Sequence, residues 1–579
     1  MTDFQDPKDH LFALVQTALS QVAPDLTDVS FVVERPKQAA HGDYACNVAM
    51  QLTRVLRRNP RELAQAVVAA LPESSLVVKT EIAGAGFINF FLTPAARYQV
   101  VRQVQEMGER FGRCEYGARK KVQVEFVSAN PTGPLHVGHG RGAAYGASLA
   151  AVLDFAGYKV QKEYYVNDAG RQMDILAVST WLRYLSLFGI DVPFPKNCYQ
   201  GDYVREMAKQ VKDAHGDRYV HQPWTVLEGV PAADEDAEGH LDGLIANAKK
   251  LLSDDWHYIH NFALNEQLGD GRNDLAEFGV HFDNWYSEKS LFDSGLVERA
   301  IDQLEVNGHL YMQDGAKWFR STSFGDEKDR VVQRENGLYT YFASDIAYHQ
   351  NKFERGFHKV INVWGADHHG YIPRVKGALT ALNFDPEKLD IALVQFANLI
   401  RDGKQVSMST RSGEFVTLRE LRGEVGNDAA RFFYVLRKSE QHLDFDLDLA
   451  KSQSNDNPVY YIQYAHARIC RVLEEWAGVA SDFAGAKLEL LGNEHEAAIL
   501  RRLSDFSVTV ENAAREYAPH VVAFYLKDLA ADFHSYYNAE RFLVDDVELS
   551  LARLALIDAV RQTMVNGLRL LGVTAPEKM

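Results

Sequence analysis

The chain has 579 residues, too many for a single hydrophobic core, and its 46% hydrophobic and 24% charged content is typical of a globular protein of several domains. No apolar run reaches membrane-spanning length and the N-terminus, MTDFQDPKDH, lacks the basic start of a signal peptide, so we expect a cytoplasmic protein with no membrane partner. The net charge of −17 weighs against a nucleic-acid partner, yet a large acidic protein can carry a local basic face, so this class stays open.

Residues 1–115 are expected to form a separate small α+β domain. An amphipathic helix at Asp9–Val22 leads to an apolar strand near Val29–Val33. Alternating segments at Leu76–Ile82 and Phe87–Leu92 predict a hairpin. No cluster of residues in this part of the sequence has a catalytic pattern.

Residues 116–400 alternate strands with helices, which predicts an α/β doubly wound parallel sheet with an insertion at about 195–270. The first strand, Val122–Val127, runs into a turn-rich segment and then reaches two histidines three residues apart, His136 and His139. A strand, a loop and a glycine-rich helix start form an anion site, because free backbone N–H groups and the positive end of the helix dipole converge there.

Two interpretations of this segment come from its glycines. Residues 138–143 fit the dinucleotide fingerprint G-x-G-x-x-G/A, and Glu163 follows at a tolerable distance for a ribose contact. That fingerprint turns directly out of its strand, however, whereas about ten residues intervene here, more than such loops usually have. Alternatively, the glycines only allow the helix to pack closely on the sheet.

The two histidines favour a third interpretation. HVGH at a helix start resembles the HIGH signature of class I aminoacyl-tRNA synthetases, and the preceding SANPTGPL resembles the form found in arginyl-tRNA synthetases. The resemblance implies that the adenine ring of ATP lies on the glycine backbone and that the histidines act catalytically by donating to the phosphates. The implied ATP-binding residues of this segment are His136, Gly138, His139 and Gly140.

Polar residues follow the second strand of the predicted sheet. Asp168 and Arg171 either face a ligand site at this edge or cap the next helix. The insertion is acidic and rich in loop residues, with a helix at Asp242–Leu252. Its His257 and His260 lack a third ligand, and the four cysteines of the chain form no C-x-x-C pair, so we expect no structural zinc and no metal-binding residues.

Two carboxylates, Glu288 and Asp345, lie in aromatic segments near predicted strand ends, and Tyr341 precedes Asp345 by one helical turn. Carboxylates that accept hydrogen bonds in a fork, beside an aromatic ring, suit a planar guanidinium. Each acid could equally be a solvated surface residue.

The resemblance to arginyl-tRNA synthetases implies an arginine pocket at these positions. It also adds an asparagine before the HIGH signature, for the amino-acid end of arginine, and a polar residue in the GADHHG stretch. The implied arginine-binding residues are Asn130, Glu288, Tyr341, Asp345 and either Asp367 or His368.

The second class I signature, KMSKS, falls in the predicted connecting region 401–454. Only Met408 and Ser409 match it, and the resemblance assigns both to ATP binding. Serine and threonine stand where the signature has the lysines that neutralise charge on the departing pyrophosphate. Lys404 and Arg411 are the nearby candidates for this catalytic role.

Residues 455–579 are expected to form an all-α bundle, and the DAAR tetrapeptide at 428–431 resembles the D-A-L-R signature of the family. Tyr460 and Tyr464 recur at helical spacing, so they either pack in the bundle core or stack on unpaired bases. The resemblance makes this bundle the anticodon-binding domain, with Met579 beside the tRNA, and makes residues 1–115 a second tRNA-contacting domain.

Over its full length the chain thus resembles a bacterial-type arginyl-tRNA synthetase. The resemblance implies that ATP, accompanied by Mg²⁺, activates L-arginine as arginyl-adenylate, that the arginyl group passes to tRNA(Arg), and that activation requires bound tRNA. We expect a monomer without a separate editing domain. Catalysis would consist of positioning and charge stabilisation, without a side-chain nucleophile.

Three other functions stay open at this stage. A class I synthetase for glutamine, glutamate or cysteine would share the HIGH turn, although the acid pair suits a cationic substrate better. A small adenylyltransferase with an HxGH motif would need no tRNA-binding domain. The degenerate KMSKS segment is also compatible with a catalytically silent tRNA-binding paralogue.

Overall fold

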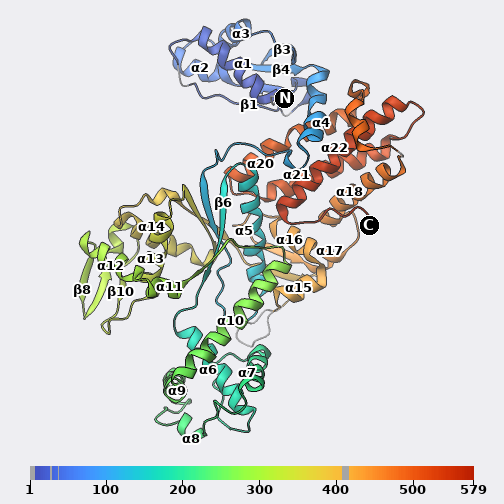
Figure 1. The fold of residues 1–579 in the computed structure, drawn as a ribbon. Helices are drawn as coiled ribbons and strands as arrows, with labels where there is room; N and C mark the ends of the chain where they lie inside the picture. Colours follow the sequence, from blue (N-terminus) through green and yellow to red (C-terminus); the bar gives the residue numbers. More distant parts are fainter. Residues whose placement is uncertain (1–6, 27–28, 37, 407–415, 477) are drawn as a thin grey trace.

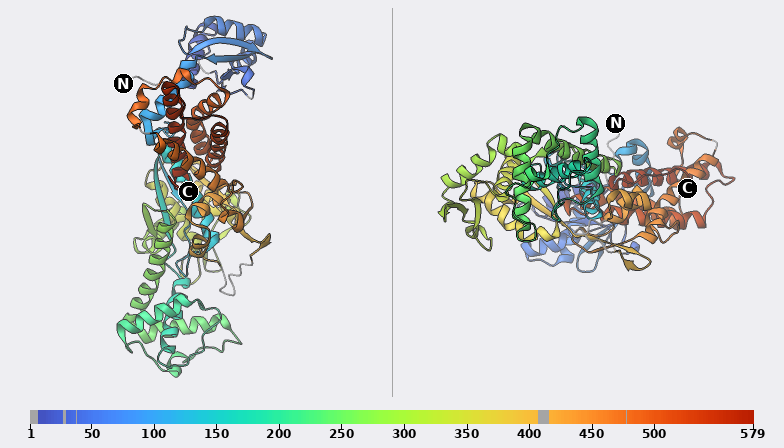
Figure 2. Two further views of the ribbon diagram at one scale, coloured as in Figure 1. Left: turned by 90° about the vertical axis from the view of Figure 1, so that its right-hand side faces the viewer. Right: turned by 90° about the horizontal axis from the view of Figure 1, so that it is seen from below.

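The computed structural model describes residues 7–26, 29–36, 38–406, 416–476 and 478–579. The chain is elongated, with the N-terminal domain at one end, the parallel sheet in the middle and a helical insertion at the other end (Figures 1 and 2). The C-terminal helices lie beside the sheet, next to the N-terminal domain. Within the described ranges, no helix is long and apolar enough to cross a membrane.

The N-terminal domain has one antiparallel sheet of order β1-β2-β4-β3 and a core of its own. The predicted hairpin is present as β3 and β4, and the predicted strand near Val29–Val33 is reduced to the two residues of β1. Its elements are α1 (Pro7–Val22), β1 (Val33–Glu34), β2 (Tyr44–Cys46), α2 (Val48–Leu56), α3 (Pro60–Ala70), β3 (Val77–Ala83) and β4 (Phe87–Leu92), and α4 (Pro94–Met107) leads out of it.

The central sheet is parallel throughout, with the order β12-β11-β5-β6-β7, which confirms the predicted doubly wound fold. Its strands are β5 (Lys121–Glu125), β6 (Lys159–Val166), β7 (Asn284–Ser287), β11 (Lys359–Gly365) and β12 (Leu389–Val394), and its helices include α5 (Val137–Phe155), α13 (Tyr341–Glu354) and α14 (Ile372–Ala381). The strand order reverses beside β5. In such sheets ligands bind outside the carboxyl ends of the strands at this reversal.

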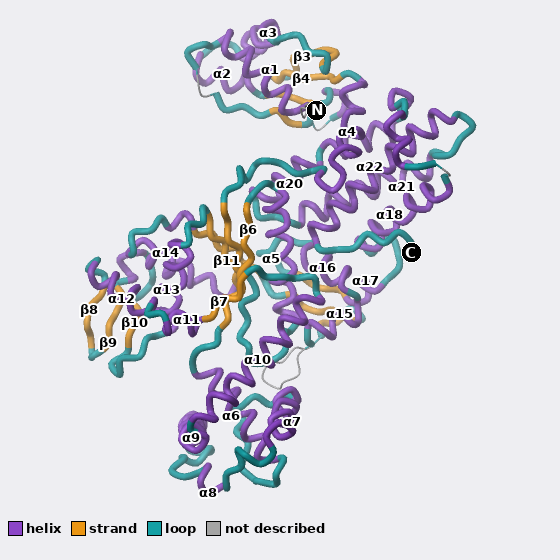
Figure 3. The backbone as a smooth tube through the Cα atoms, in the orientation of Figure 1, coloured by secondary structure: helices purple, strands orange, loops and turns teal. Residues whose placement is uncertain are grey.

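The insertion is a helical subdomain with more helix than predicted: the predicted helix at Asp242–Leu252 lies within α9, and the other helices were not predicted. It contains α6 (Arg171–Ser186), α7 (Asp202–His215), α8 (Pro223–Val226), α9 (Ala237–Leu252) and α10 (Asp254–Glu277), and Figure 3 shows these helices below the sheet. The buried residues of α7, which are Val204, Met207, Ala208 and Val211, follow the spacing of one helical face. The many acidic residues lie on solvent-facing sides and hid this pattern.

Two smaller sheets flank the central one. The first, of order β10-β9-β8, is antiparallel and shares a core with α12 and α13, whereas the second has the order β14-β13-β15. The elements are α11 (Glu288–Asp293), α12 (Leu296–Val306), β8 (Leu310–Gln313), β9 (Ala316–Phe319), β10 (Arg330–Gln333), β13 (Ala397–Arg401), β14 (Lys404–Gln405), α15 (Leu418–Val425), α16 (Asn427–Val435), β15 (Leu443–Asp446) and α17 (Leu447–Lys451).

The C-terminal part is an all-α bundle, as predicted. It consists of α18 (Pro458–Glu475), α19 (Glu494–Ser504), α20 (Phe506–Arg515), α21 (His520–Ala539) and α22 (Val547–Leu571). Its apolar core is continuous with that of the central sheet, because α22 and α20 pack against α5. The Tyr145 hydroxyl on α5 donates to the Tyr517 carbonyl at 2.8 Å across this boundary.

Candidate active site

Two adjoining cavities open at the carboxyl ends of β5 and β11, where the strand order reverses. One of about 460 Å³ extends toward the start of α5, and the other of about 410 Å³ extends toward α13. Both are lined by Val127, Ser128, Val363, Trp364, Gly365 and His368. Molecules bound in the two cavities would therefore meet over Ser128 and His368.

The first cavity contains the two histidines of the HVGH turn. His136 caps α5 by accepting at Nδ1 from the Gly138 N–H at 3.1 Å, and His139 Nδ1 accepts from the His136 N–H at 3.2 Å. The rings stack with their centroids 3.7 Å apart. Burial lowers the pKa of His136, and burial together with His136 lowers the pKa of His139 to about 3. Both rings are therefore neutral at pH 7, and because Nδ1 accepts, the proton is on Nε2.

The glycines of this turn have two different surroundings. A Cβ atom on Gly138 would lie 2.8 Å from Cε1 of His136, so only glycine leaves room for the capping ring. A Cβ atom on Gly140 would lie 2.8 Å from the Tyr434 hydroxyl, and Gly140 lines neither cavity, although the sequence placed it with ATP. Gly142, which the sequence analysis did not select, lines the first cavity instead.

The second cavity has a buried carboxylate in its wall. Asp345, on the first turns of α13, accepts a hydrogen bond from the Tyr371 hydroxyl. Burial, with added repulsion from Glu288 and Glu125, raises the pKa of Asp345 to about 7. Tyr341 lies at the cavity mouth and is 61% exposed. A cation bound in this cavity would therefore stabilise the ionised form of Asp345, and the accessible ring of Tyr341 lies beside it.

Glu288 lies behind this wall and does not itself line the cavity. It is 4% exposed, and its Oε1 accepts from the Ser344 hydroxyl at 3.0 Å. Burial raises its pKa. Its neighbour Asp168 accepts from Ser287 Oγ at 2.6 Å and from the Lys289 N–H at 2.8 Å, so Asp168 fixes the start of α11 and lines neither of the two cavities.

The remaining residues predicted for the amino acid lie on the side of the first cavity. Asn130 is exposed and lines the first cavity. Asp367 lines only the first cavity, whereas His368 lines both. The structure thus separates the two alternatives of the GADHHG stretch by position, with His368 at the junction of the cavities.

Family models match three parts of this chain. They are the arginyl tRNA synthetase N-terminal domain at residues 9–92, the class I (R) tRNA synthetase catalytic domain at 101–184 and 256–446, and the DALR anticodon-binding domain at 462–579. The gap in the catalytic match falls within the helical insertion. The arginine–tRNA ligase of Azoarcus sp. (strain BH72) is 68% identical over 99% of this chain and 100% of its own length. That of Dechloromonas aromatica (strain RCB) is 65% identical over 99% and 100%.

The chain belongs to the arginyl-tRNA synthetase family. Solved structures agree with this assignment. A putative arginyl-tRNA synthetase from Campylobacter jejuni has a TM-score of 0.74 at 32% identity and covers 84% of this chain and 100% of its own. The Thermus thermophilus arginyl-tRNA synthetase has a TM-score of 0.75 at 24% identity over 99% and 100%, and therefore shares the fold.

The second class I signature of this arginyl-tRNA synthetase lies largely outside the described residues, including Met408, Ser409 and Arg411. Lys404 is exposed on β14 and lines neither cavity. After the signature, the chain passes directly beside the HVGH turn. The Val137 N–H donates to the Val416 carbonyl at 3.1 Å, and the Leu418 N–H donates to the Leu135 carbonyl at 2.8 Å.

The residues predicted to contact tRNA lie on α18 and at the C-terminus. Tyr460 and Tyr464 are both partly buried and stack with centroids 5.8 Å apart. Tyr460 and Met579 line a common depression of about 540 Å³ between α16 and α18. Tyr464 lies outside this depression and stacks under the Arg468 guanidinium at 4.4 Å. The two tyrosines thus combine packing with partial exposure.

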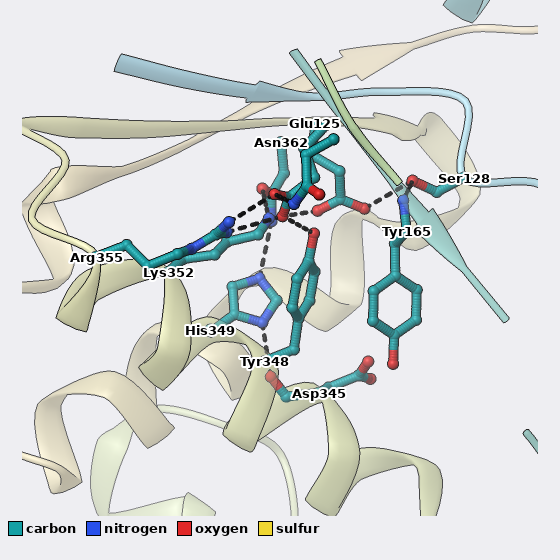
Figure 4. Close-up of polar contacts among 11 residues, drawn as sticks. Glu125, Ser128, Tyr165, Asp345, Tyr348, His349, Lys352, Arg355 and Asn362 are labelled. Atoms are coloured by element: carbon teal, nitrogen blue, oxygen red, sulfur yellow. Dashed lines mark hydrogen bonds and ion pairs between the residues drawn. The ribbon is translucent and has the colours of Figure 1, made fainter. Parts of the chain in front are cut away.

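Sequence reasoning missed a buried polar network, shown in Figure 4, of which Glu125, Tyr348 and His349 also line the second cavity. It links strand ends to α13 through Glu125, Tyr348, His349, Lys352, Arg355 and Asn362. These residues are scattered among apolar neighbours and match no motif. The sequence did contain one signal for this network, which is that charged residues occur inside apolar strands and a helix. Because charged side chains are very rarely buried without a partner, such residues indicate buried pairs.

Proposed function

We propose that this arginine–tRNA ligase charges tRNA(Arg) with arginine through an arginyl-adenylate formed between the two cavities. The observation that carries the proposal is their junction at Ser128 and His368, with neutral imidazoles in one cavity and a buried carboxylate in the other. ATP would occupy the first cavity, with Mg²⁺ as part of the MgATP substrate. Arginine would extend its guanidinium into the second.

In the first step the arginine carboxylate attacks the α-phosphorus of ATP. A carboxylate oxygen–phosphorus bond forms, and the bond to the departing pyrophosphate breaks. The positive end of the α5 dipole and the Nε2–H groups of His136 and His139 would support the phosphate charge. Because both rings are neutral, they donate without adding a cation that would have to be desolvated.

In the second step a hydroxyl of the terminal ribose of the tRNA attacks the arginyl carbonyl and forms the ester bond. The acyl–phosphate bond breaks, AMP leaves with the bonding electrons, and the hydroxyl proton passes to a phosphate oxygen of the departing AMP. Both steps use nucleophiles supplied by the substrates. The protein contributes alignment, which can account for a large part of the rate acceleration when reacting atoms are held about 3 Å apart. The many packing contacts and hydrogen bonds of the site are suited to this alignment of the substrates.

Selection of arginine follows from the buried acids. Within the described residues the Asp345 carboxylate forms no ion pair, and burial raises its pKa, so a cation that enters the cavity would stabilise its ionised form. An amino acid without a guanidinium would leave this carboxylate, and Glu288 behind it, uncompensated in a buried site. Such sites reject the wrong ligand strongly, which explains why no editing step is required.

Further parts of the proposal rest on family membership. The DALR domain would bind the anticodon arm, with Tyr460, Tyr464 and Met579 as contacts, and residues 1–115 would touch the tRNA elsewhere. Lys404 and Arg411 would neutralise charge on pyrophosphate. The protein would act as a monomer, and arginine activation would require bound tRNA.

Pyrophosphate exchange with each amino acid, with and without tRNA(Arg), tests the proposal. Exchange should occur with arginine only, and only when tRNA is present. Exchange with another amino acid would overturn the pocket assignment. Equal exchange without tRNA would overturn tRNA-dependence alone. No exchange with arginine and tRNA, from a protein that still binds tRNA(Arg), would identify a silent paralogue.

A further inference from the structure

Lys352 on α13 is a completely buried ammonium group, and its partner Glu125 lines the second cavity; Figure 4 shows their contact. It forms an ion pair with Oε2 of Glu125 at the end of β5, donates to Oδ1 of Asn362 on β11 at 2.8 Å, and lies 4.3 Å from the centroid of the Tyr348 ring. A buried ion pair often contributes no more stability than apolar side chains of similar volume. Stability alone therefore does not explain why the Lys352–Glu125 ion pair lies beside a substrate cavity.

The ion pair between Lys352 and Glu125 supports the turn between the two cavities. Val127 and Ser128 both have positive φ angles, +68° and +43°, which are strained for residues with a Cβ atom, and for the β-branched valine especially. Three hydrogen bonds hold the turn at Ser128. Its hydroxyl donates to Oε1 of Glu125 at 2.9 Å and accepts from the Tyr165 N–H at 3.1 Å, and its carbonyl accepts from Asn167 at 3.1 Å. Lys352 holds Glu125, and Glu125 holds this turn.

A chain of hydrogen bonds also connects Lys352 with the backbone of Asp345. Because the Asp345 carbonyl can only accept, His349 donates to it from Nδ1, at 2.7 Å. Burial lowers the pKa of His349 to about 3, so the ring is neutral and Nε2 accepts from the Asn362 amide at 2.8 Å. That orientation of Asn362 leaves Oδ1 for Lys352. All the hydrogen bonds thus run in one direction, from Lys352 to the backbone that carries Asp345.

We propose that Lys352 is a positioning residue for amino-acid activation. Through Glu125 it holds the strained turn where the two substrates meet, and through Asn362 and His349 it holds the helix turn that carries Asp345. Loss of this ammonium would misalign arginine against ATP without removing any group that touches ATP. The inference rests on the proposed function, because it assigns arginine to the second cavity.

The test separates positioning from stability by removing the charge pair in two ways. Lys352→Met alone leaves the Glu125 carboxylate buried without a partner and should lower the melting temperature strongly. The double variant Lys352→Met with Glu125→Gln removes both charges and should recover most of that loss. Despite its recovered stability, we expect its kcat/KM for arginine in tRNA-dependent pyrophosphate exchange to fall at least tenfold, with less than a threefold change in KM for ATP. Because Glu125 also lines the second cavity, Glu125→Gln alone, which keeps Lys352 and an acceptor for it, measures the direct effect of losing this carboxylate and should cause a smaller loss.

The control is the neighbouring ion pair between Arg355, which directly follows α13 and is partly exposed, and the buried Glu163 on β6. Arg355 donates to both carboxylate oxygens of Glu163 at 2.7 and 2.8 Å, and neither residue lines a cavity. Arg355→Met with Glu163→Gln should change the melting temperature by a similar amount and leave kcat/KM for arginine within threefold of the wild type. If the control lowers kcat/KM for arginine as much as the Lys352 pair does, the effect is general and the proposal fails.

A third variant addresses the case in which the double variant does not fold. Asn362→Asp retains an acceptor for Lys352 but removes the donor to His349, and it should raise KM for arginine more than KM for ATP. Wild-type kinetics in either test variant would overturn the positioning role. Absence of arginine-dependent exchange in the wild type would instead refute the proposed function itself.

Discussion

The two histidines at the start of α5 combine structural and chemical roles in single side chains. His136 uses Nδ1 to cap the helix, and the same hydrogen bond fixes the proton on Nε2, where a phosphate can accept it. His139 uses Nδ1 in the same way toward the His136 backbone. A capping residue of another type could satisfy the helix terminus without providing this donor.

His136→Ala should slow adenylate formation by about a hundredfold, the cost of losing one donor to developing charge. The lost cap should lower stability by only about 1 kcal/mol. His136→Asp is the matched control, because aspartate restores a capping acceptor without a donor. Single-turnover measurement of adenylate and a thermal melt should show recovered stability with no recovery of rate, and recovery of both would contradict the donor role.

At the scale of a single carboxyl group, the proposed contact between Asp345 and the guanidinium would make arginine binding depend on pH. Its pKa of about 7 in the free protein lies above its usual value of 3.8, so protonation competes with guanidinium binding as the pH falls below 7. KM for arginine should rise about tenfold per pH unit between pH 7 and pH 5, while KM for ATP stays nearly constant. The same raised pKa means that the unliganded protein loses stability as the pH rises from about 4 to 7.

Asp345→Asn should abolish this pH dependence and raise KM for arginine by at least a hundredfold, because the buried guanidinium loses its charge partner. Kinetics of pyrophosphate exchange across the pH range check both effects. Equal losses in arginine and ATP binding would contradict the assignment of Asp345 to the amino acid.

Among the secondary-structure elements, α10 and α15 connect the helical insertion with the nucleotide side of the site. Asp274 on α10 is fully buried and accepts from Arg419 at 2.9 Å and Arg422 at 3.4 Å on α15. The residues before α15 pair with the HVGH turn, with Thr417 opposite His136. The insertion is therefore linked through α15 to the turn that lines the first cavity.

Asp274→Asn should lower the melting temperature and raise KM for ATP several-fold, with KM for arginine unchanged, because two buried or half-buried arginines lose their shared carboxylate. Asp270→Asn is the control, since its ion pair with Arg419 at 2.5 Å is partly exposed and such pairs contribute about 1 kcal/mol or less. A rise in KM for arginine equal to that for ATP would argue against a specific connection from Asp274 through α15 to the HVGH turn.

Across the whole molecule, Arg431 joins three parts of the chain at one point. This buried guanidinium donates to the Leu571 carbonyl at the end of the bundle and to the Phe278 and Gly279 carbonyls after the insertion, at 3.2 to 3.3 Å. Asp428, one turn earlier, binds Thr574 in the C-terminal segment. The DAAR tetrapeptide thus fixes the anticodon-binding bundle to the catalytic domain.

Arg431→Lys should destabilise the protein by about 3 kcal/mol or more, because an ammonium group cannot reach acceptors arranged around a planar fork. Arg437→Lys, at an exposed position shortly after α16, should have little effect. Thermal melts combined with limited proteolysis between catalytic domain and bundle check the prediction. A melt unchanged in Arg431→Lys would show that this residue does not join the domains.

The sequence by itself determined the fold class, the HVGH turn and the aromatic-acidic segment around Asp345, because each depends on local order or spacing along the chain. It underestimated the helices of the insertion, where acidic surface residues masked the apolar faces. Only the tertiary structure showed that Gly140 packs on Tyr434, that Glu288 lies behind Ser344, and that His368 rather than Asp367 touches both cavities. It also brought Glu125, Lys352 and Asn362 together from two strands and a helix, since buried charges can pair only after the sheet and its helices have assembled.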